Sequence, residues 1–240
     1  MQSLKTLYER FWGDLYFIRR YEWSEINKHL GNLKGKNALD LACGGGFFTE
    51  KLAKKGALAK GIDADENTIK IARKYHNKPN VAFTTAKAEK LPYPRDFFDI
   101  VVSVCAMQHF ENDEKAMREI NRVLKPSGKL ILSVDSFSYP GTPLDTVKMH
   151  QRKEHVLRLY TKESMKEKLE RNGFKVVSSK YIFTSPLSSG ILRLRMRSGN
   201  MPLLLLFFPL LYYPVRISDF LFKTNKGGYI LILAAINTQE

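Results

Sequence analysis

Cysteine is scarce in this sequence, and its scarcity excludes a disulfide-stabilised scaffold. Only Cys43 and Cys105 occur among 240 residues, and nothing in their spacing frames a disulfide pair. We therefore expect reduced thiols in a cytoplasmic protein. Residues 1–10 carry charges and lack a long apolar core, so they do not match a secretory signal. No internal repeat appears, and with 44% hydrophobic residues the chain suits one α/β domain with a sizeable core.

Acidic residues are also few. The chain holds 39 Lys and Arg against 24 Asp and Glu, which gives a net charge of +15. Residues 1–150 carry 24 basic and 18 acidic side chains, whereas residues 151–240 carry 15 and 6. A positive field attracts nucleic acid, anionic lipid or acidic substrates without choosing between them. Solubility alone is the alternative explanation.

Short apolar runs alternate with amphipathic stretches along the chain. Strands are predicted at 37–41, 58–62, 81–84, 98–104, 129–134, 174–181 and 229–236, and helices at 48–55, 66–76, 113–124 and 162–171. This alternation predicts βαβ units and a parallel sheet. We predict a single domain over 1–240, with a helical lid at 1–30, a core at 31–184, an apolar and basic insertion at 185–226 and the last strand at 227–240.

The chain is organised around a glycine-rich turn over 38–49. The apolar run 37–41 predicts a buried strand, and it passes through three glycines into a helix that begins near Phe47. Glycines let the main chain turn tightly and approach a ligand that a Cβ would obstruct. The helix then offers unpaired N–H groups to an anionic part of that ligand. With Asp40 before the glycines and Asp63 after the next strand, the pattern predicts a nucleotide-type cofactor.

A missing glycine narrows the class of cofactor. Dinucleotide sites favour Gly-x-Gly-x-x-Gly, because the pyrophosphate and the helix must approach closely. Gly44 and Gly46 are present, but Thr49 stands where the third glycine would be. Asp40, four residues ahead of the first glycine, is poorly placed for a pyrophosphate and suits a ligand with an ammonium group and no phosphates. S-adenosylmethionine is such a ligand.

Five motifs, in order, resemble those of the class I S-adenosylmethionine-dependent methyltransferases. The resemblance is strong over 37–136 and continues weakly to 181. It rests on the first motif Leu39–Gly46 (LDLACGGG), the second motif Gly61–Asp63 (GID) and the later stretches 88–93, 97–101 and 122–130. It implies a Rossmann-like, doubly wound α/β fold with a seven-stranded, mostly parallel sheet whose last strand is antiparallel.

The same resemblance implies a set of cofactor residues. Asp40 would position the methionine end, and Asp63 would accept hydrogen bonds from both ribose hydroxyls, since an ionised carboxylate offers two acceptor oxygens. Where the family often has Asp, this chain has Lys87, which cannot accept from the adenine amino group, so Glu89 or a main-chain carbonyl must replace it. The expected cofactor residues are Asp40, Ala42, Cys43, Gly44, Gly46, Asp63, Ala64, Ala88, Glu89 and Val104.

The acceptor side is expected beyond the fourth strand. Methyl transfer from a sulfonium is an in-line displacement, to which the protein contributes mainly positioning and a dry pocket. A base is needed only when the nucleophile carries a proton, as a hydroxyl does. His109 lies where the methyl group should be, and imidazole titrates near neutrality, so we predict that His109 is catalytic. Packing or capping of the next helix is its alternative role, and weaker acceptor-side candidates are Tyr16, Tyr21, Asp135 and Tyr139.

Metal and nucleic-acid sites have less support. His150 and His155 are five residues apart, which does not stack them on one helix face, and no cysteine pair accompanies them, so a metal site is not predicted. For nucleic acid the basic charge is the only support. Family members that methylate base amines usually carry an Asn/Asp-Pro-Pro-aromatic stretch where this chain has Cys-Ala-Met-Gln at 105–108.

The apolar stretch 201–215 bears on the acceptor. It is too short, and too interrupted by its three prolines, to span a bilayer, and arginines and lysines flank it. Such a segment suits an anionic membrane surface, with 193–226 as the contact, or a tunnel for a lipid-like acceptor; a lid or a homodimer surface is the alternative. We therefore expect a methyltransferase that converts S-adenosylmethionine to S-adenosylhomocysteine and acts on a small or lipophilic acceptor of the quinone-precursor, isoprenoid, lipid or glycolipid type. An RNA methyltransferase and a non-catalytic cofactor-binding protein remain as alternatives.

Overall fold

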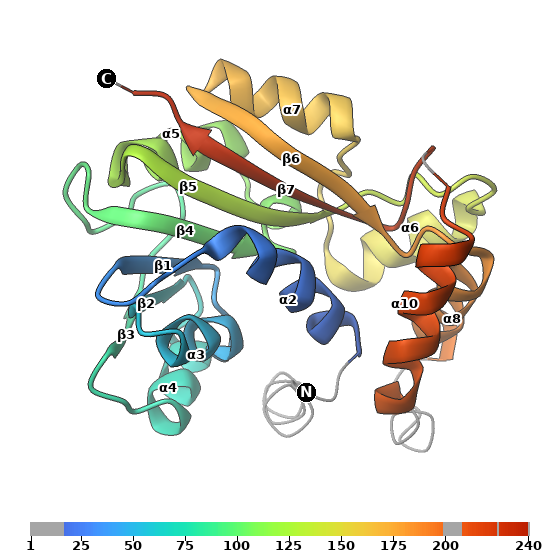
Figure 1. Cartoon of the computed structure of the whole chain (residues 1–240), viewed down its shortest axis with the longest axis horizontal. Coiled ribbons are helices and arrows are strands. Elements are labelled where there is room, and N and C mark those ends of the chain that lie inside the picture. The colour runs from blue at the N-terminus through green and yellow to red at the C-terminus, as the bar shows by residue number, and fades with distance from the viewer. Residues whose placement is uncertain (1–16, 199–207, 225, 240) are drawn as a thin grey trace.

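A seven-stranded sheet forms the centre of the molecule. The computed structural model describes residues 17–198, 208–224 and 226–239 of the chain (Figure 1). Its strands are β1 (Asn37–Leu41), β2 (Leu58–Asp63), β3 (Val81–Thr85), β4 (Phe98–Val104), β5 (Leu124–Asp135), β6 (Phe174–Ile182) and β7 (Ile230–Asn237). They lie in the order β3-β2-β1-β4-β5-β7-β6. Because β7 is antiparallel to both neighbours and the other adjacent pairs are parallel, the predicted seven-stranded, mostly parallel sheet is confirmed.

The fifth strand differs most from its predicted bounds. The sequence predicts a turn at 125–128 and a strand from Lys129, whereas β5 already begins at Leu124, which pairs with Phe98 of β4. The register between the two strands shifts between Phe98 and Ile100. Ser127 adopts a positive φ of 60° there. The turn predicted at 125–128 is thus an irregularity inside a longer strand.

Eight α-helices and two 3₁₀-helices are present in the part of the chain that the structure describes. They are α2 (Phe17–Leu30), α3 (Phe47–Lys54), α4 (Glu66–Tyr75), η1 (Met107–His109), α5 (Asp113–Val123), α6 (Leu144–Glu154), α7 (Lys162–Arg171), α8 (Pro186–Ser198), η2 (Phe208–Leu211) and α10 (Tyr212–Leu221). The side chains of Asp65, Asn112 and Thr161 accept backbone hydrogen bonds at the starts of α4, α5 and α7. Sequence periodicity predicted these three helices but not α6, α8 or α10.

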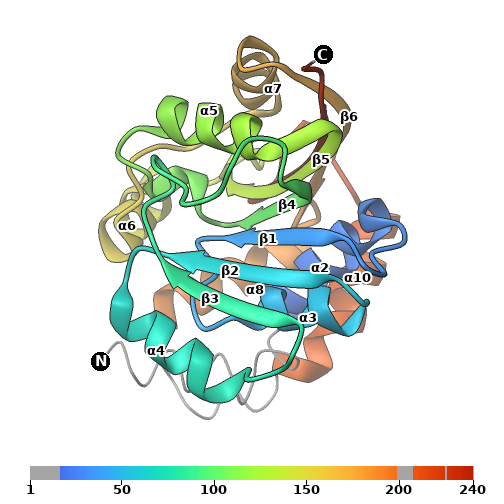
Figure 2. The same ribbon diagram turned by 90° about the vertical axis from the view of Figure 1, so that its left-hand side faces the viewer.

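Helices cover both faces of the sheet. In Figures 1 and 2, α2 and α3 lie on one face, and α5 and α7 lie on the other. Neighbouring residues of β4 contribute to opposite cores. Val102 packs in the core that contains Ile26 of α2 and Leu52 of α3, while Val101 packs in the core that contains Met117 of α5. Burial on both faces explains why the strand sequence is almost continuously apolar.

The helix α2, the first in the described residues, is packed into the core of the fold. Phe17 and Ile26 are fully buried, and the helix packs against β5, β7 and α10. The lid predicted at 1–30 therefore stays a prediction only for residues 1–16, which lie outside the described residues. The predicted insertion before the last strand contains α8, η2 and α10, apart from residues 199–207, which also lie outside them. Among the described helices, none is long and apolar enough to cross a membrane.

Candidate active site

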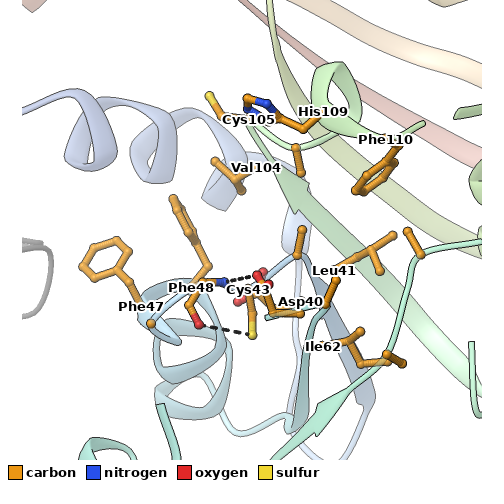
Figure 3. Close-up of a pocket in the computed structure, with 18 of the residues that line it drawn as sticks. Asp40, Leu41, Cys43, Phe47, Phe48, Ile62, Val104, Cys105, His109 and Phe110 are labelled. Carbon is orange, nitrogen blue, oxygen red and sulfur yellow. Dashed lines mark hydrogen bonds between the residues drawn. The ribbon is translucent and has the colours of Figure 1, made fainter. Parts of the chain in front are cut away.

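The glycine turn lines one side of a cavity of about 500 Å³, which lies at the carboxyl ends of β1, β2 and β4. The turn needs left-handed backbone, since Ala42 has φ of 59° and Gly44 has φ of 51°. In Figure 3, Asp40, Cys43 and Ile62 gather at one end of the cavity, and Cys105 and His109 lie at the other. A volume of this size suits a nucleotide-sized ligand together with part of a second molecule.

Asp63 connects the glycine turn to the second strand. Leu41 of β1 pairs with Ile62 of β2, which brings the next carboxylate beside the turn. Asp63 Oδ2 accepts the Gly44 N–H at 2.9 Å, and Oδ1 accepts the Asp65 N–H at 3.0 Å. Each carboxylate oxygen keeps further acceptor capacity for a ligand. The residue predicted to hold two hydroxyls is thus already oriented by two backbone donors.

Asp40 is a buried carboxyl group at the floor of the cavity. Its side chain accepts a hydrogen bond from the Thr49 hydroxyl at 2.6 Å, and the residue is 1% exposed. Burial raises the pKa of Asp40 to about 7, although the hydrogen bonds from Thr49 oppose this shift. A cationic group bound beside Asp40 would stabilise its ionised form. The site is therefore matched to an ammonium group.

Nine of the ten predicted cofactor residues line the cavity. They are Asp40, Ala42, Cys43, Gly44, Asp63, Ala64, Ala88, Glu89 and Val104. Gly46 is the exception, because its Cα faces the side chain of Phe83. An added Cβ would lie 2.7 Å from the Phe83 ring, at a backbone φ of 87° that favours glycine. Gly46 is thus needed for packing and for the start of α3.

His109 and the residues around it form the other end of the cavity. Val104, Cys105, His109, Phe110 and Glu111 line this end. His109 is exposed, and its Nδ1 lies 3.3 Å from the His155 carbonyl oxygen. Its predicted catalytic role stays a prediction.

Of the weaker candidates for acceptor contacts, Tyr21 is turned away from the cavity. Its hydroxyl donates to Asp219 at 3.0 Å, and the residue is 3% exposed. Tyr16 lies outside the described residues. Asp135 and Tyr139 follow the same strand edge as the cavity without lining it.

A buried carboxylate network that sequence patterns do not reveal supports this end of the cavity. Glu22 of α2 is 0% exposed and accepts hydrogen bonds from Arg19 at 2.9 Å, the Ser133 hydroxyl at 2.8 Å and the Cys105 thiol at 2.9 Å. Arg19 and Cys105 line the cavity. Burial and the charge of Glu22 raise the pKa of the Cys105 thiol, which keeps the hydrogen that it donates to Glu22.

Further lining residues were also missed by sequence reasoning. Phe47, Phe48 and Glu50 come from the first turn of α3, and His76 follows α4. The two phenylalanines directly follow the glycine turn, and this position is a signal that could have identified them. Within the described ranges, no group of three or more His, Cys, Asp or Glu side chains could hold a metal ion.

Comparison with known proteins identifies this arrangement. Residues 39–132 match the family model of the methyltransferase domain. The match assigns residues 39–132 to a methyltransferase domain. The matched segment runs from the first motif into β5, and it includes Asp40 and Asp63 of the site.

Curated methyltransferases match part of this chain. The ubiquinone biosynthesis O-methyltransferase of Coxiella burnetii is 33% identical over 103 residues, which are 42% of this chain and 44% of that protein. The ubiquinone/menaquinone biosynthesis C-methyltransferase of Ectopseudomonas mendocina is 37% identical over 130 residues, 51% of this chain and 50% of that protein. The chain thus spans half or less of the length of these two relatives.

Solved structures share the methyltransferase fold. An S-adenosylmethionine-dependent methyltransferase from Mesorhizobium loti superposes with a TM-score of 0.65 at 19% identity, over 90% of this chain and 97% of that one. The phosphoethanolamine N-methyltransferase 2 of Haemonchus contortus, solved with S-adenosyl-L-methionine, gives 0.68 at 18% identity, over 92% and 53%. The cofactor of the family is S-adenosylmethionine, and the site fits it: Asp40 suits its ammonium group, and Asp63 suits its ribose hydroxyls.

The raised pKa of Asp40 predicts a pH dependence of cofactor binding. The ammonium group of S-adenosylmethionine favours ionised Asp40, so we expect affinity to rise several-fold between about pH 5.5 and 7, with proton release on binding. The stability of the free protein depends on pH in the opposite direction. The folded pKa lies above the unfolded one, so this contribution to stability is present at low pH and is lost as pH rises from about 4 through 7.

Isothermal titration in buffers of different ionisation enthalpy measures this proton release. Asp40→Asn is the control, since it should remove the proton release and flatten the pH dependence. Affinity that is equally pH-dependent in Asp40→Asn would show that another group titrates.

Proposed function

We propose that this protein transfers the methyl group of S-adenosylmethionine to a lipophilic acceptor of the quinone-precursor type. The observation that carries the proposal is one cavity that joins the cofactor residues Asp40 and Asp63 to an end lined by His109 and Phe110. The names of the Coxiella and Ectopseudomonas relatives support the acceptor class. A nucleophile placed at this second end would meet the sulfonium methyl group in line with its departing sulfur.

The reaction requires little covalent help from the protein. The carbon–sulfur bond breaks as the new bond to the acceptor forms, and its electron pair stays on sulfur, which leaves S-adenosylhomocysteine. Phe47, Phe48, Val104 and Phe110 give the cavity an apolar wall that limits access of water. Orientation and desolvation of this kind supply up to about 7–11 kcal/mol in favourable reactions.

Two measurements test the proposed reaction. Isothermal titration determines the affinity for S-adenosylmethionine and S-adenosylhomocysteine, and transfer of a labelled methyl group is followed with phenolic quinol precursors, lipid extracts and RNA as acceptors. Labelled quinol or lipid product supports the proposal. Cofactor binding without transfer to any acceptor would instead support a non-catalytic binding protein, and labelled RNA alone would support the RNA alternative.

We also propose that the helices before the last strand rest on an anionic membrane surface. An apolar set of side chains is exposed on α8, η2 and α10, with Phe220 at 78%, Leu210 at 69% and Phe222 at 66%, and with Leu187, Leu194, Tyr213, Ile217 and Leu221 between 48% and 61%. Patches of this kind mark interaction surfaces. This set of eight residues is called the apolar face below.

The charge of the segment matches anionic lipid. Residues 186–226 contain six arginines and lysines and a single acidic residue, Asp219. Asp219 is 5% exposed and fully engaged in hydrogen bonds, so it adds no repulsion at the surface. An apolar face in a segment whose sequence is rich in cations is the pattern of segments that bind at the membrane interface. A lipophilic acceptor could then be taken up from the membrane without crossing water.

Vesicle flotation tests the apolar face. We expect the protein to float with vesicles of phosphatidylglycerol and phosphatidylethanolamine, and the double variant Phe220→Asp/Phe222→Asp to lose at least about tenfold in partitioning, since each buried side chain contributes about 1.5–3 kcal/mol. Leu58→Asp is the matched control, because Leu58 is a 48% exposed apolar residue on β2. A wild-type protein that does not float, and whose apolar face instead holds a homodimer together in solution, would contradict the membrane proposal.

A further inference from the structure

The cavity extends past Asp63 to a loop that follows β3. Because β2 lies between β1 and β3, this loop lies on the other side of Asp63 from the glycine turn (Figure 2). Asp63 pairs with Thr85 at the end of β3, and its carbonyl oxygen accepts the Ala86 N–H at 3.0 Å. All four residues of the loop, 86–89, line the cavity. The loop therefore bounds the cavity on the side of β3.

Two charged residues of this loop, one a donor and one an acceptor, line the cavity. Lys87 carries an ammonium group, which only donates hydrogen bonds, and Glu89 carries a carboxylate, which only accepts them. Neither side chain forms a hydrogen bond or an ion pair within the described residues. By contrast, the carboxylates of Asp40 and Asp63 are both hydrogen-bonded inside the protein. Lys87 and Glu89 are therefore available to a ligand.

The shape of the cofactor directs its base toward the same loop. The ribose of S-adenosylmethionine carries the sulfur arm at C5′ and the base at C1′, on opposite ends of the ring. With the ribose hydroxyls on Asp63 and the ammonium group beside Asp40 on β1, we expect the base to lie on the side of β3. Ile62 and Ala64 also line the cavity and can contact the flat faces of a base. The polar edge of the base then meets residues 86–89.

The polar edge of a purine depends on the group at position 6. Adenine presents a 6-amino donor, whereas hypoxanthine, its deaminated form, presents a 6-oxo acceptor as guanine does, together with an N1–H donor. Glu89 can accept from the amino group of adenine or from the N1–H of hypoxanthine. Lys87 can donate to the oxo group. An edge lined by carboxylates alone would reject the oxo group, because two acceptors would face each other.

We propose that the nucleoside end of the cofactor site accepts 6-oxopurines as well as adenine, and that Lys87 determines this specificity. The ligand class is the deaminated thioether nucleosides, of which S-inosylhomocysteine is the deaminated form of S-adenosylhomocysteine. Such a ligand competes with S-adenosylmethionine for the cavity. This inference concerns the cofactor and does not depend on the proposed acceptor.

Isothermal titration with two thioether nucleosides isolates the contribution of position 6. S-adenosylhomocysteine and S-inosylhomocysteine share their ribose, amino-acid arm and net charge, so the ratio of their dissociation constants reports the base edge. We expect wild type to bind them within about fivefold of each other, because each base finds a charged partner. Lys87→Asp should weaken S-inosylhomocysteine at least about 30-fold relative to S-adenosylhomocysteine, since a donor is replaced by an acceptor. Lys87→Met, which only removes the donor, should weaken it by about tenfold.

Lys90→Asp is the matched control for Lys87→Asp. Lys90 is exposed, lies three residues further on and does not line the cavity, so the same change of charge should leave the ratio at its wild-type value. An equal shift of the ratio in Lys90→Asp would show a long-range effect of charge and overturn the assignment of Lys87, as would an unchanged ratio in Lys87→Met.

The wild-type ratio decides the inference separately from the proposed reaction. If wild type binds S-adenosylhomocysteine more than about tenfold more tightly than S-inosylhomocysteine, the site selects adenine and the inference is wrong, while the proposed methyl transfer stands. If wild type binds neither nucleoside, the cofactor site is misplaced and the inference fails with it. Binding of both nucleosides without methyl transfer to any acceptor would reject the proposed reaction and leave the inference standing.

Discussion

Replacing Asp63 by alanine is expected to weaken binding of S-adenosylmethionine and S-adenosylhomocysteine by roughly 100-fold or more. Hydrogen bonds to a charged group contribute about 1.5–3 kcal/mol each, and two ribose hydroxyls would lose their acceptor. The substitution also releases the Gly44 N–H, which Asp63 holds at 2.9 Å, so the glycine turn loses its tie to β2. Isothermal titration with both ligands measures the effect directly.

Two further variants serve as controls for Asp63→Ala. Glu66→Ala removes an exposed carboxylate of α4 three residues further on, which does not line the cavity, and should leave both affinities within about twofold of wild type. Asp63→Asn keeps one acceptor oxygen and should fall between the two. If Asp63→Ala folds and binds both ligands as tightly as wild type, the assignment of the ribose position is wrong.

Local sequence patterns were sufficient for the cofactor half of the site. A buried strand, a glycine turn and a helix start are specified by neighbours in sequence, and parallel pairing of β1 with β2 then brings Asp63 to Gly44 without further information. For this reason nine of ten predicted residues line the cavity. Gly46 is the residue that does not line the cavity. A glycine is required there because the side chain of Phe83, on β3 two strands away from β1, leaves no room for a Cβ.

The acceptor half depends on contacts that no local pattern contains. Glu22 and Ser133 are 111 residues apart, and they meet only because α2 packs across β5. The residues at the cofactor end of the candidate site can therefore be predicted from the sequence, whereas those at the other end can be identified only from the fold.

A single buried carboxylate connects the apolar face to the rest of the fold. Asp219 of α10 receives five donors, which are the backbone N–H groups of Phe183, Thr184 and Ser185 and the hydroxyls of Ser188 and Tyr21. These donors come from α2, the segment after β6, and α8. Burial, assisted by the charge of Asp219, raises the pKa of Tyr21, which therefore remains a hydroxyl donor.

Asp219→Ala is consequently expected to lower the free energy of unfolding by about 3–5 kcal/mol, because it leaves several buried donors without an acceptor. Urea unfolding followed by circular dichroism measures the change. Asp145→Ala, which removes an exposed carboxylate from the first turn of α6, should change stability by less than about 0.5 kcal/mol. Asp219→Asn should lie between them, since an amide offers one acceptor oxygen in place of two. An Asp219→Ala protein as stable as wild type would mean that water replaces the lost carboxylate, and that α10 is held by its apolar contacts alone.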